Sequence, residues 1–249
     1  MPTWKLLLDS VVGTSHAQTN LPCQDYASGR MLDAGTIVLV CADGAGSASR
    51  SQFGSRFVCT GLLNIIATAL EGGLALKDVS RERVVDWHAT IRRRLSLEAC
   101  RENLDLREFA STVLTAIVGP AQALFSHIGD GVIVYGEGDG YKTPFWPQQG
   151  EYANTTYFLT GSDFEDQLAF EGIDRQIDEV ALLTDGLQSL ALHYASRSVH
   201  SPFFQPMFTA LRDTGDPDEL REPLKAFMNS PAVNSRTDDD KTLVLATRK

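Results

Sequence analysis

A strand that ends in an aspartate and a glycine turn is the feature that most restricts the fold of this chain. Residues 36–42, with the sequence TIVLVCA, form a short apolar run rich in β-branched side chains. Such a run predicts a strand that is buried. Asp43 follows it directly, and Gly44 and Gly46 permit a tight turn in which main-chain carbonyls can face a ligand. The pattern therefore predicts a carboxylate at the edge of a sheet.

Carboxylates stand beside strands in three further places. These are Asp130 after the run 124–128, Asp185 after the run 180–184, and Asp238–Asp240 before the run 242–246. In an antiparallel arrangement such strand ends can meet at one edge of a sheet. Carboxylates that gather without cations are driven to protonate, at a cost in stability. Because oxygen-only ligands select Mg²⁺ or Mn²⁺ over zinc, the pattern predicts a shared metal site. The alternative is that each aspartate is only a turn residue or a helix cap.

Composition limits the classes of protein to which the chain can belong. Its 249 residues predict one domain, 1–249, and its net charge of -10 argues against binding to nucleic acid or to an anionic membrane. The four cysteines have no C-x-x-C spacing, which favours reduced thiols. The N-terminus lacks a signal-peptide layout, and we identify no apolar run of membrane-spanning length. We expect a soluble, cytoplasmic protein that acts without a membrane.

The order of apolar patterns predicts an α+β domain with mainly antiparallel sheets. Expected strands lie at 4–12, 36–42, 111–118, 121–128, 132–135, 180–184 and 242–247, and expected helices at 53–70, 83–101, 187–194, 203–211 and 217–228. Short turns between the central strands favour hairpins. Apart from 155–160, residues 142–178 are irregular, and we expect most of them to form surface loop.

Six short motifs, in this order, resemble those of the 2C-type metal-dependent protein phosphatases, the PPM family. They are Gln24-Asp25, Asp43-Gly44-Ala45-Gly46, Ala110-Ser111-Thr112, Gly129-Asp130-Gly131, Asp185-Gly186 and Asp239-Asp240-Lys241-Thr242. The resemblance runs from near residue 13 to the C-terminus and is closest to the short bacterial form. It implies a four-layer α-β-β-α sandwich with a site for two Mn²⁺ or Mg²⁺ ions at one end. It also implies a monomer with a flap over about 145–178 beside that site; the alternative is an ordinary surface connection.

The resemblance implies a role for each matching residue. Asp43 would bridge both ions, the Gly44 carbonyl would bind the second ion, and Asp185 and Asp239 would complete the first. Asp25 would act through metal-bound water, and Asp130 aligns with a ligand of a third, weaker ion. The implied reaction is hydrolysis of phosphoserine or phosphothreonine in a phosphoprotein, the product of a serine/threonine kinase. A water shared by the two ions would attack phosphorus.

The chain departs from the family pattern at several positions. Gln24 stands where many members have a glutamate, Ser189 offers no carboxylate for a third ion, and Asn20 falls near the place of a phosphate-binding arginine. Ala45 takes the place of a histidine proposed as the general acid of many members. His16, in the polar loop before Asp25, is a candidate for that acid; the alternative is a loop histidine that orders residues 13–20.

Two other functions stay open at this point. A phosphoprotein-binding pseudophosphatase on the same fold would bind phosphopeptide without turnover. A nucleotide-binding protein could use the turn 44–49, GAGSAS, although this turn lacks the third glycine of a dinucleotide-binding motif and has no acidic residue at the expected offset.

Overall fold

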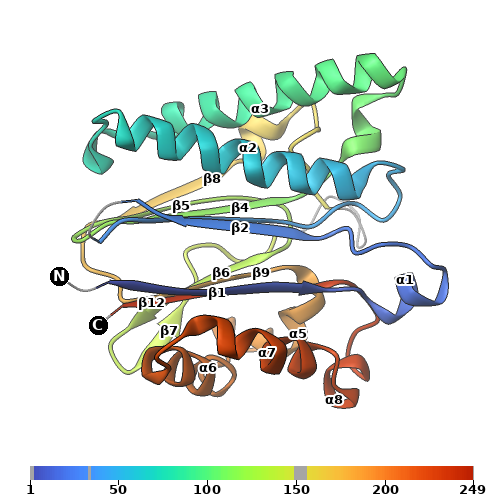
Figure 1. The fold of residues 1–249 in the computed structure, drawn as a ribbon. Helices are drawn as coiled ribbons and strands as arrows, with labels where there is room; N and C mark the ends of the chain where they lie inside the picture. Colours follow the sequence, from blue (N-terminus) through green and yellow to red (C-terminus); the bar gives the residue numbers. More distant parts are fainter. Residues whose placement is uncertain (1–2, 33–34, 149–155, 249) are drawn as a thin grey trace.

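The computed structural model describes residues 3–32, 35–148 and 156–248, and these form four stacked layers (Figure 1). Two long helices cover one sheet, a second sheet lies beneath the first, and shorter helices cover the outer face of the second sheet. Apolar side chains fill all three interfaces between the layers. The expected α-β-β-α sandwich is confirmed.

The first sheet has the order β2-β3-β4-β5-β8, and every neighbouring pair is antiparallel. Its strands are β2 (Tyr26–Met31), β3 (Ile37–Ala42), β4 (Val113–Val118), β5 (Ala123–Ile128) and β8 (Ala169–Ile173). Strand β3 is buried along its whole length because alternate residues face opposite layers. Val38 and Val40 face the helices, whereas Ile37 and Leu39 face the second sheet.

The second sheet has the order β1-β12-β9-β6-β7 and is also antiparallel. Its strands are β1 (Trp4–Val11), β12 (Lys241–Arg248), β9 (Glu179–Leu183), β6 (Val132–Glu137) and β7 (Gly140–Lys142). A separate short hairpin joins β10 (Leu192–His193) to β11 (Ser198–Val199). The antiparallel pairing of β3 on both sides excludes the parallel βαβ unit that a dinucleotide-binding turn at residues 44–49 would need.

Helices α2 (Ser51–Glu71) and α3 (Arg81–Glu102) cover the first sheet. Helix α2 is long and apolar enough to cross a membrane by length and composition, so the expectation that no apolar run has membrane-spanning length was wrong for residues 51–71. In the structure it packs as a core helix, with Val58, Leu62 and Ile66 turned into the cluster beneath it. Helix α3 begins at a serine cap, because the Ser80 side chain accepts from the Arg83 amide.

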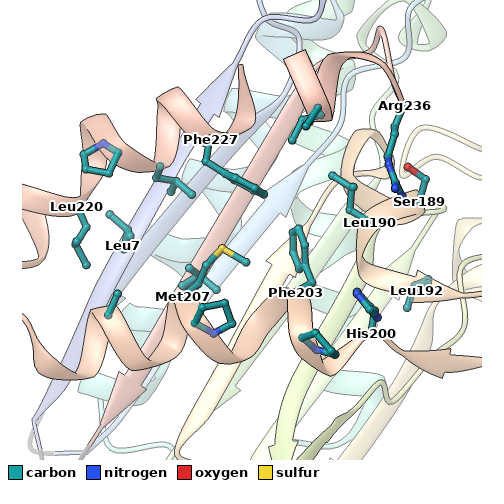
Figure 2. A pocket seen from close by; sticks show the side chains of 18 of the residues that line it. Leu7, Ser189, Leu190, Leu192, His200, Phe203, Met207, Leu220, Phe227 and Arg236 are labelled. Carbon is teal, nitrogen blue, oxygen red and sulfur yellow. The ribbon is translucent and has the colours of Figure 1, made fainter. Parts of the chain in front are cut away.

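The second sheet is covered by α6 (Ser201–Asp213) and α7 (Arg221–Met228), with the short helices α5 (Gln188–Ala191) and α8 (Pro231–Asn234) beside them. A groove of about 710 Å³ remains between α6 and α7 (Figure 2). Leu7 lies at its base, and Phe203, Met207 and Phe227 line its sides.

Several elements differ from the expectations. Strand β8 and helix α4 (Phe164–Gln167) lie in the stretch expected to be mostly loop, and β2 was not anticipated. The helix expected at 187–194 stops at Ala191, where the β10–β11 hairpin begins. Residues 155–160 were the exception to the irregular pattern of 142–178. Residue 155 lies outside the described residues, and 156–160 contain no strand.

Candidate active site

Strand register places the acidic strand ends of both sheets at one edge of the sandwich. Tyr26 pairs with Ala42 in the first sheet, so Asp25 and Asp43 flank the same end. In the second sheet Leu183 pairs with both Leu243 and Val132. Asp185, Asp239 and Asp130 therefore lie just beyond the ends of neighbouring strands. This is the placement that carboxylates beside strands predicted.

Asp43 is fixed by the strand beside it. Its amide donates to the Thr112 hydroxyl over 2.9 Å, and its carbonyl accepts from the Thr112 amide over 2.8 Å. Gly44, the next residue, leaves no room for a side chain: an added Cβ would lie 2.7 Å from the Gln24 carbonyl oxygen and 2.8 Å from the Ser51 carbonyl oxygen. The close approach of three backbone segments explains the glycine after Asp43.

Three of the predicted metal ligands gather into one cluster. One carboxylate oxygen from each of Asp43, Asp130 and Asp185 lies within 4.8 Å of the others. Two neighbours hold Asp130: the Thr156 hydroxyl donates to its Oδ2, and the Gln188 side-chain amide donates to its carbonyl. The cluster brings together residues more than 140 positions apart in the sequence, which only the meeting of the two sheets permits.

Asp25 lies deeper than this cluster and ties the two sheets together. Its Oδ2 accepts from the hydroxyls of Thr184, at 2.7 Å, and Thr242, at 2.9 Å. Its Oδ1 is buried and has no hydrogen-bond partner among the described residues. A buried carboxylate oxygen without a donor carries a desolvation cost that a cation or a bound water would offset.

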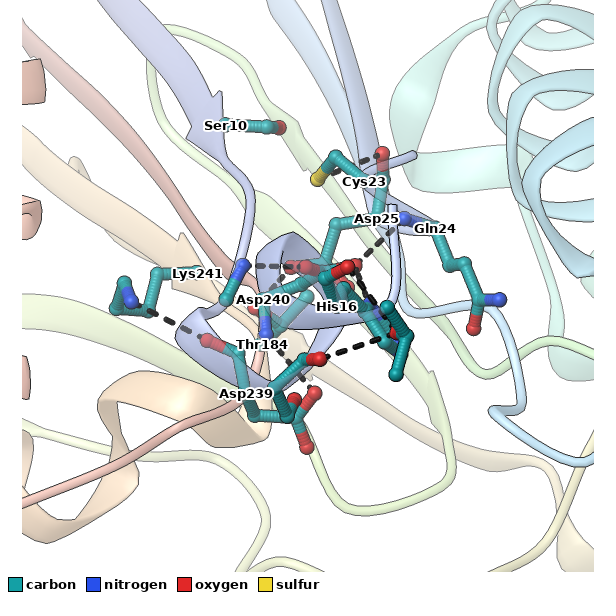
Figure 3. Close-up of polar contacts among 12 residues, drawn as sticks. Ser10, His16, Cys23, Gln24, Asp25, Thr184, Asp239, Asp240 and Lys241 are labelled. Carbon is teal, nitrogen blue, oxygen red and sulfur yellow. Dashed lines mark hydrogen bonds and ion pairs between the residues drawn. The ribbon is translucent and has the colours of Figure 1, made fainter. Parts of the chain in front are cut away.

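The aspartates of the 238–240 run point in different directions. Asp239 is exposed and lines the same hollow as Asp43 and Asp185. Asp240 is buried instead: it accepts from the amides of Gly13 and Gln24, both over 2.6 Å (Figure 3). The resemblance placed the metal role on Asp239 and assigned none to Asp240. The function of Asp240 in closing the loop 13–24 was missed, and its only signal was the acidic run itself.

His16 lies on the short helix α1 (Thr14–Gln18), at the wall of this hollow. Its Nδ1 is 3.0 Å from Asp240 Oδ2, in a close charge contact that is not aligned as a hydrogen bond. The hollow has a volume of about 340 Å³, and no lysine or arginine of the described chain lines it. His16 is the one basic side chain among its lining residues. The hollow is also lined by Ser15, Ser47, Thr156 and Phe158, and no sequence pattern marks these residues as part of a site.

The position expected to hold a histidine is apolar in this chain. Ala45 packs with Ala48, Ala110 and the ring of Phe158 in a small cluster beside the aspartates. Ala45 can neither donate nor accept a proton from its side chain, so this wall contributes shape alone.

Burial and mutual repulsion hold the pKa values of the aspartates high. Burial raises the pKa of Asp25 to about 7, where hydrogen bonds from Thr184 act in the opposite direction. Burial, with the charges of Asp130 and Asp239, raises the pKa of Asp185 to about 8. The pKa of Asp43 is raised by burial and by the charge of Asp25, and that of Asp130 is raised chiefly by burial. Negative charge is thus concentrated at a hollow whose described lining contains no lysine or arginine.

The donor set fits a hard divalent cation. All side-chain donors of the cluster are carboxylate oxygens, and Asp130 Oδ1, like Asp25 Oδ1, is buried without a partner in the described chain. Such a set suits Mg²⁺ or Mn²⁺, which prefer oxygen ligands, and not zinc. A cation would also relieve the repulsion that raises these pKa values.

Solved structures with the same fold include bacterial phosphatases. A bacterial serine phosphatase matches with a TM-score of 0.69 at 14% identity, with 98% of each chain covered. The serine/threonine phosphatase Stp1 from Staphylococcus aureus matches with a TM-score of 0.66 at 15% identity, covering 99% of this chain and 95% of that one. At these identities the likeness establishes the fold.

Sequence comparison establishes the family. The serine/threonine-protein phosphatase 3 of Escherichia coli (strain K12) is 41% identical over 251 residues, which cover 98% of both proteins. The family model for protein phosphatase 2C matches residues 12–229. That match includes Asp25, Asp43, Asp130 and Asp185. The chain therefore belongs to the protein phosphatase 2C family.

Proposed function

We propose that this protein hydrolyses phosphoserine and phosphothreonine in proteins with the help of two Mn²⁺ or Mg²⁺ ions. The observation that carries the proposal is the cluster of Asp43, Asp130 and Asp185, whose oxygens lie within 4.8 Å of one another at the end of the sandwich. The name of the Escherichia coli relative, a serine/threonine phosphatase, supports the substrate class.

We assign the ligands as the resemblance implies. Asp43 would bridge two ions, with the Gly44 carbonyl on the second ion and Asp185 and Asp239 on the first. Asp25 would act through a water, and Asp130 would serve a third, weaker site. When bound, the ions would acidify a water for attack and offset the charge of the phosphoryl oxygens.

The chain's own residues would shape the rest of the reaction. Thr112 holds Asp43 through two hydrogen bonds, and Thr184 and Thr242 hold Asp25. These contacts fix the backbone of Asp43 and the carboxylate of Asp25 before any ligand arrives, which limits reorganisation during the reaction.

His16 is our candidate for the group that protonates the departing serine or threonine oxygen. Its ring lines the hollow, and Ala45 offers no acid there. A positioned acid contributes about 10²–10⁴-fold for a poor leaving group, whereas an aryl oxide needs little help. His16→Ala should slow phosphopeptide hydrolysis far more than aryl phosphate hydrolysis, and it should remove the alkaline limb of the pH–rate profile. A uniform loss on both substrates with that limb intact would make His16 a structural residue.

One experiment separates the functions that the sequence left open. Hydrolysis of a small aryl phosphate is measured with and without Mn²⁺, beside thermal shifts with nucleotides. A metal-dependent phosphatase would hydrolyse the aryl phosphate only when Mn²⁺ is present. Phosphopeptide binding without turnover in saturating Mn²⁺ would indicate a pseudophosphatase, and stabilisation by nucleotide without metal would indicate a nucleotide-binding protein.

The setting of the reaction also belongs to this proposal. We propose a cytoplasmic monomer that removes phosphate added by a serine/threonine kinase. The net charge of -10 supports a protein that binds neither nucleic acid nor an anionic membrane.

A further inference from the structure

We propose that Asp240 is a positioning residue for His16, and that the two together replace the acid that Ala45 does not supply. The inference rests on the proposed function and names a residue to which the family resemblance gives no role. Asp240 would act in two ways: it closes the loop that carries His16, and it fixes the orientation of the imidazole.

The loop closure is made by one buried carboxylate. Asp240 is 2% exposed; its Oδ1 accepts from the Gly13 amide and its Oδ2 from the Gln24 amide, each over 2.6 Å. The two amides stand at opposite ends of the loop 13–24, which includes α1 (Figure 3). A charged acceptor makes such bonds stronger than a neutral one. Asp240 therefore sets where both ends of this loop lie.

The short helix α1 has further attachments to the same strand end. The amide and the hydroxyl of Ser15 both donate to the Asp238 carbonyl, over 3.0 Å and 2.8 Å. Gly13 lies so close that an added Cβ would be 2.3 Å from the carbonyl carbon of Asp239. Helix α1 is thus held against residues 238–240 along its first turn, and His16 is in that turn.

The imidazole faces the same carboxylate. Its Nδ1 lies 3.0 Å from Asp240 Oδ2, and His16 is only 15% exposed. An Nδ1 lone pair at this distance from a carboxylate oxygen would be repelled, so the proton belongs on Nδ1. The ring edge that carries Nε2 is left for the hollow, which the ring lines beside Asp43 and Asp239. The acid is the doubly protonated ring, which gives its Nε2 proton to the departing oxygen and keeps the proton on Nδ1.

Asparagine at position 240 would keep the size of the side chain and lose its function. An amide offers one acceptor oxygen where the carboxylate offers two, so the Gly13 or the Gln24 amide would lose its partner. The charge that faces His16 would also disappear. A ring free to turn is a poorer proton donor, because the transfer needs a fixed geometry.

A double-mutant cycle tests whether Asp240 acts through His16. Four proteins are compared: the wild type, His16→Ala, Asp240→Asn and the double variant. Each is assayed in saturating Mn²⁺ on a phosphothreonine peptide and on an aryl phosphate. We expect Asp240→Asn to lower kcat on the peptide at least about tenfold, a part of the 10²–10⁴-fold that a positioned acid contributes, and to change aryl phosphate turnover little. In the His16→Ala background Asp240→Asn should cause no further loss. The control is Asp105→Asn, which neutralises an exposed carboxylate that does not line the hollow.

The opposite result would make Asp240 an anchor of the loop and nothing more. That result is an equal loss on both substrates, or the same loss from Asp240→Asn whether or not His16 is present. Circular dichroism and thermal melting of each variant show whether the fold survives. If Asp240→Asn does not fold, Asp240→Glu replaces it in the cycle, since glutamate keeps the charge and shifts its position.

A second measurement needs no turnover and so separates this inference from the proposed function. Nitrogen NMR of the metal-free protein reports which ring nitrogen of His16 carries the proton. We expect Nδ1 in the wild type and a mixture in Asp240→Asn, together with faster hydrogen exchange at the Gly13 and Gln24 amides. An unchanged tautomer and unchanged exchange would overturn the positioning role even in an active enzyme. Absence of metal-dependent turnover with the expected NMR change would overturn the proposed function alone.

Discussion

Asp185 shows how a residue suited to metal binding destabilises the chain that carries it. Burial and the charges of Asp130 and Asp239 raise its pKa to about 8 in the folded state, above the usual value near 3.9 of an unfolded chain. Between these two pH values the folded state binds more protons than the unfolded state. Stability of the metal-free protein therefore falls as the pH rises from about 4 to about 8.

Asp185→Asn should weaken this pH dependence and remove the metal affinity. The raised pKa values of Asp25, Asp43 and Asp130 leave part of the pH dependence in place. In EDTA at pH 8 the variant should unfold at a higher denaturant concentration than the wild type, and at pH 4 the two should be alike. In Mn²⁺ the order should reverse, because only the wild type gains from the ion. Chemical unfolding under these three conditions checks this, with the exposed Asp105→Asn as the control. A variant less stable than the wild type in EDTA at pH 8 would contradict the argument.

His127 is a buried histidine through which stability depends on pH in the opposite direction to Asp185. Burial lowers its pKa to about 4, against 6.5 for the free side chain, and both ring nitrogens lack partners among the described residues. The unfolded state binds more protons between these values, so acid destabilises the fold by on the order of 2 kcal/mol at pH 5 through this residue. His127→Phe should lose less stability between pH 7 and pH 5 than the wild type does. Equal losses in urea titrations at the two pH values would show that His127 does not titrate on unfolding.

At the residue scale, the sequence predicts which aspartates stand at strand ends and cannot predict which way they face. Asp43, Asp130 and Asp185 converge as expected because strand period and glycine turns are local properties. Asp239 faces the hollow and Asp240 binds the loop 13–24, which lies more than 200 residues away in the chain. No local pattern carries that information.

Elements between residues 156 and 178 are tied to α3 rather than free. The Arg81 side chain donates to the carbonyls of Glu165 and Leu168, and that of Arg92 donates to the Thr160 carbonyl. Phe164 and Leu168 are buried in the core cluster beneath α3. The predicted flap over about 145–178 includes residues 149–155, which lie outside the described residues. Its role in selecting substrates stays a prediction.

Charge reversal tests that role without disturbing the core. Glu165 and Asp166 are exposed, so Glu165→Lys with Asp166→Lys should leave the fold intact. If this segment contacts substrates, the double variant should lower kcat/KM several-fold for phosphopeptides with basic flanks and raise it for acidic ones. Aryl phosphate, which has no flanks, should be turned over as before. The same change on all three substrates would assign the segment a structural role.

The layer of α6 and α7 leaves a groove over its sheet. The groove measures about 710 Å³. Ala210 lines the groove, so Ala210→Leu would place a larger apolar side chain at its wall. Filling apolar space commonly adds about 0.5–2 kcal/mol. The control is Gln205→Leu, at an exposed position of α6 away from the groove. A higher melting temperature for Ala210→Leu than for this control would confirm the prediction. Equal melting temperatures would show that the groove does not close around the new side chain.

The predicted elements are most accurate where periodicity is strong. Helices α2 and α3 lie within two residues of the expected bounds, since their apolar faces repeat over five or more turns. Strands β2 and β8 were missed because each has a mixed sequence, YASGRM and AFEGI, that becomes a strand only by pairing at the edge of the sheet. Tertiary pairing decides such segments, and their own residues do not.

For the whole molecule, the two sheets each bring part of the site. Asp25 and Asp43 come from the edge of the first sheet, and Asp185 and Asp239 from the edge of the second. Hydrogen bonds from Thr184 and Thr242 to Asp25 cross between the two sheets. An ion bound by residues of both sheets would therefore join the two halves of the sandwich, and metal binding should appear in global stability.

Metal removal tests this at the scale of the whole molecule. Mn²⁺ at about 100 times its dissociation constant should stabilise the fold by about 2.7 kcal/mol, and EDTA should remove that gain together with activity. Asp43→Asn should show neither the gain nor turnover, because the bridging charge is lost while Thr112 still holds the backbone. Calorimetric melting of both proteins with EDTA, Mg²⁺ and Mn²⁺ gives the comparison, and restored turnover after Mn²⁺ is added back shows that EDTA did no lasting damage. Full activity in excess EDTA, or an equal Mn²⁺ gain in Asp43→Asn, would rule out a metal centre built on this carboxylate.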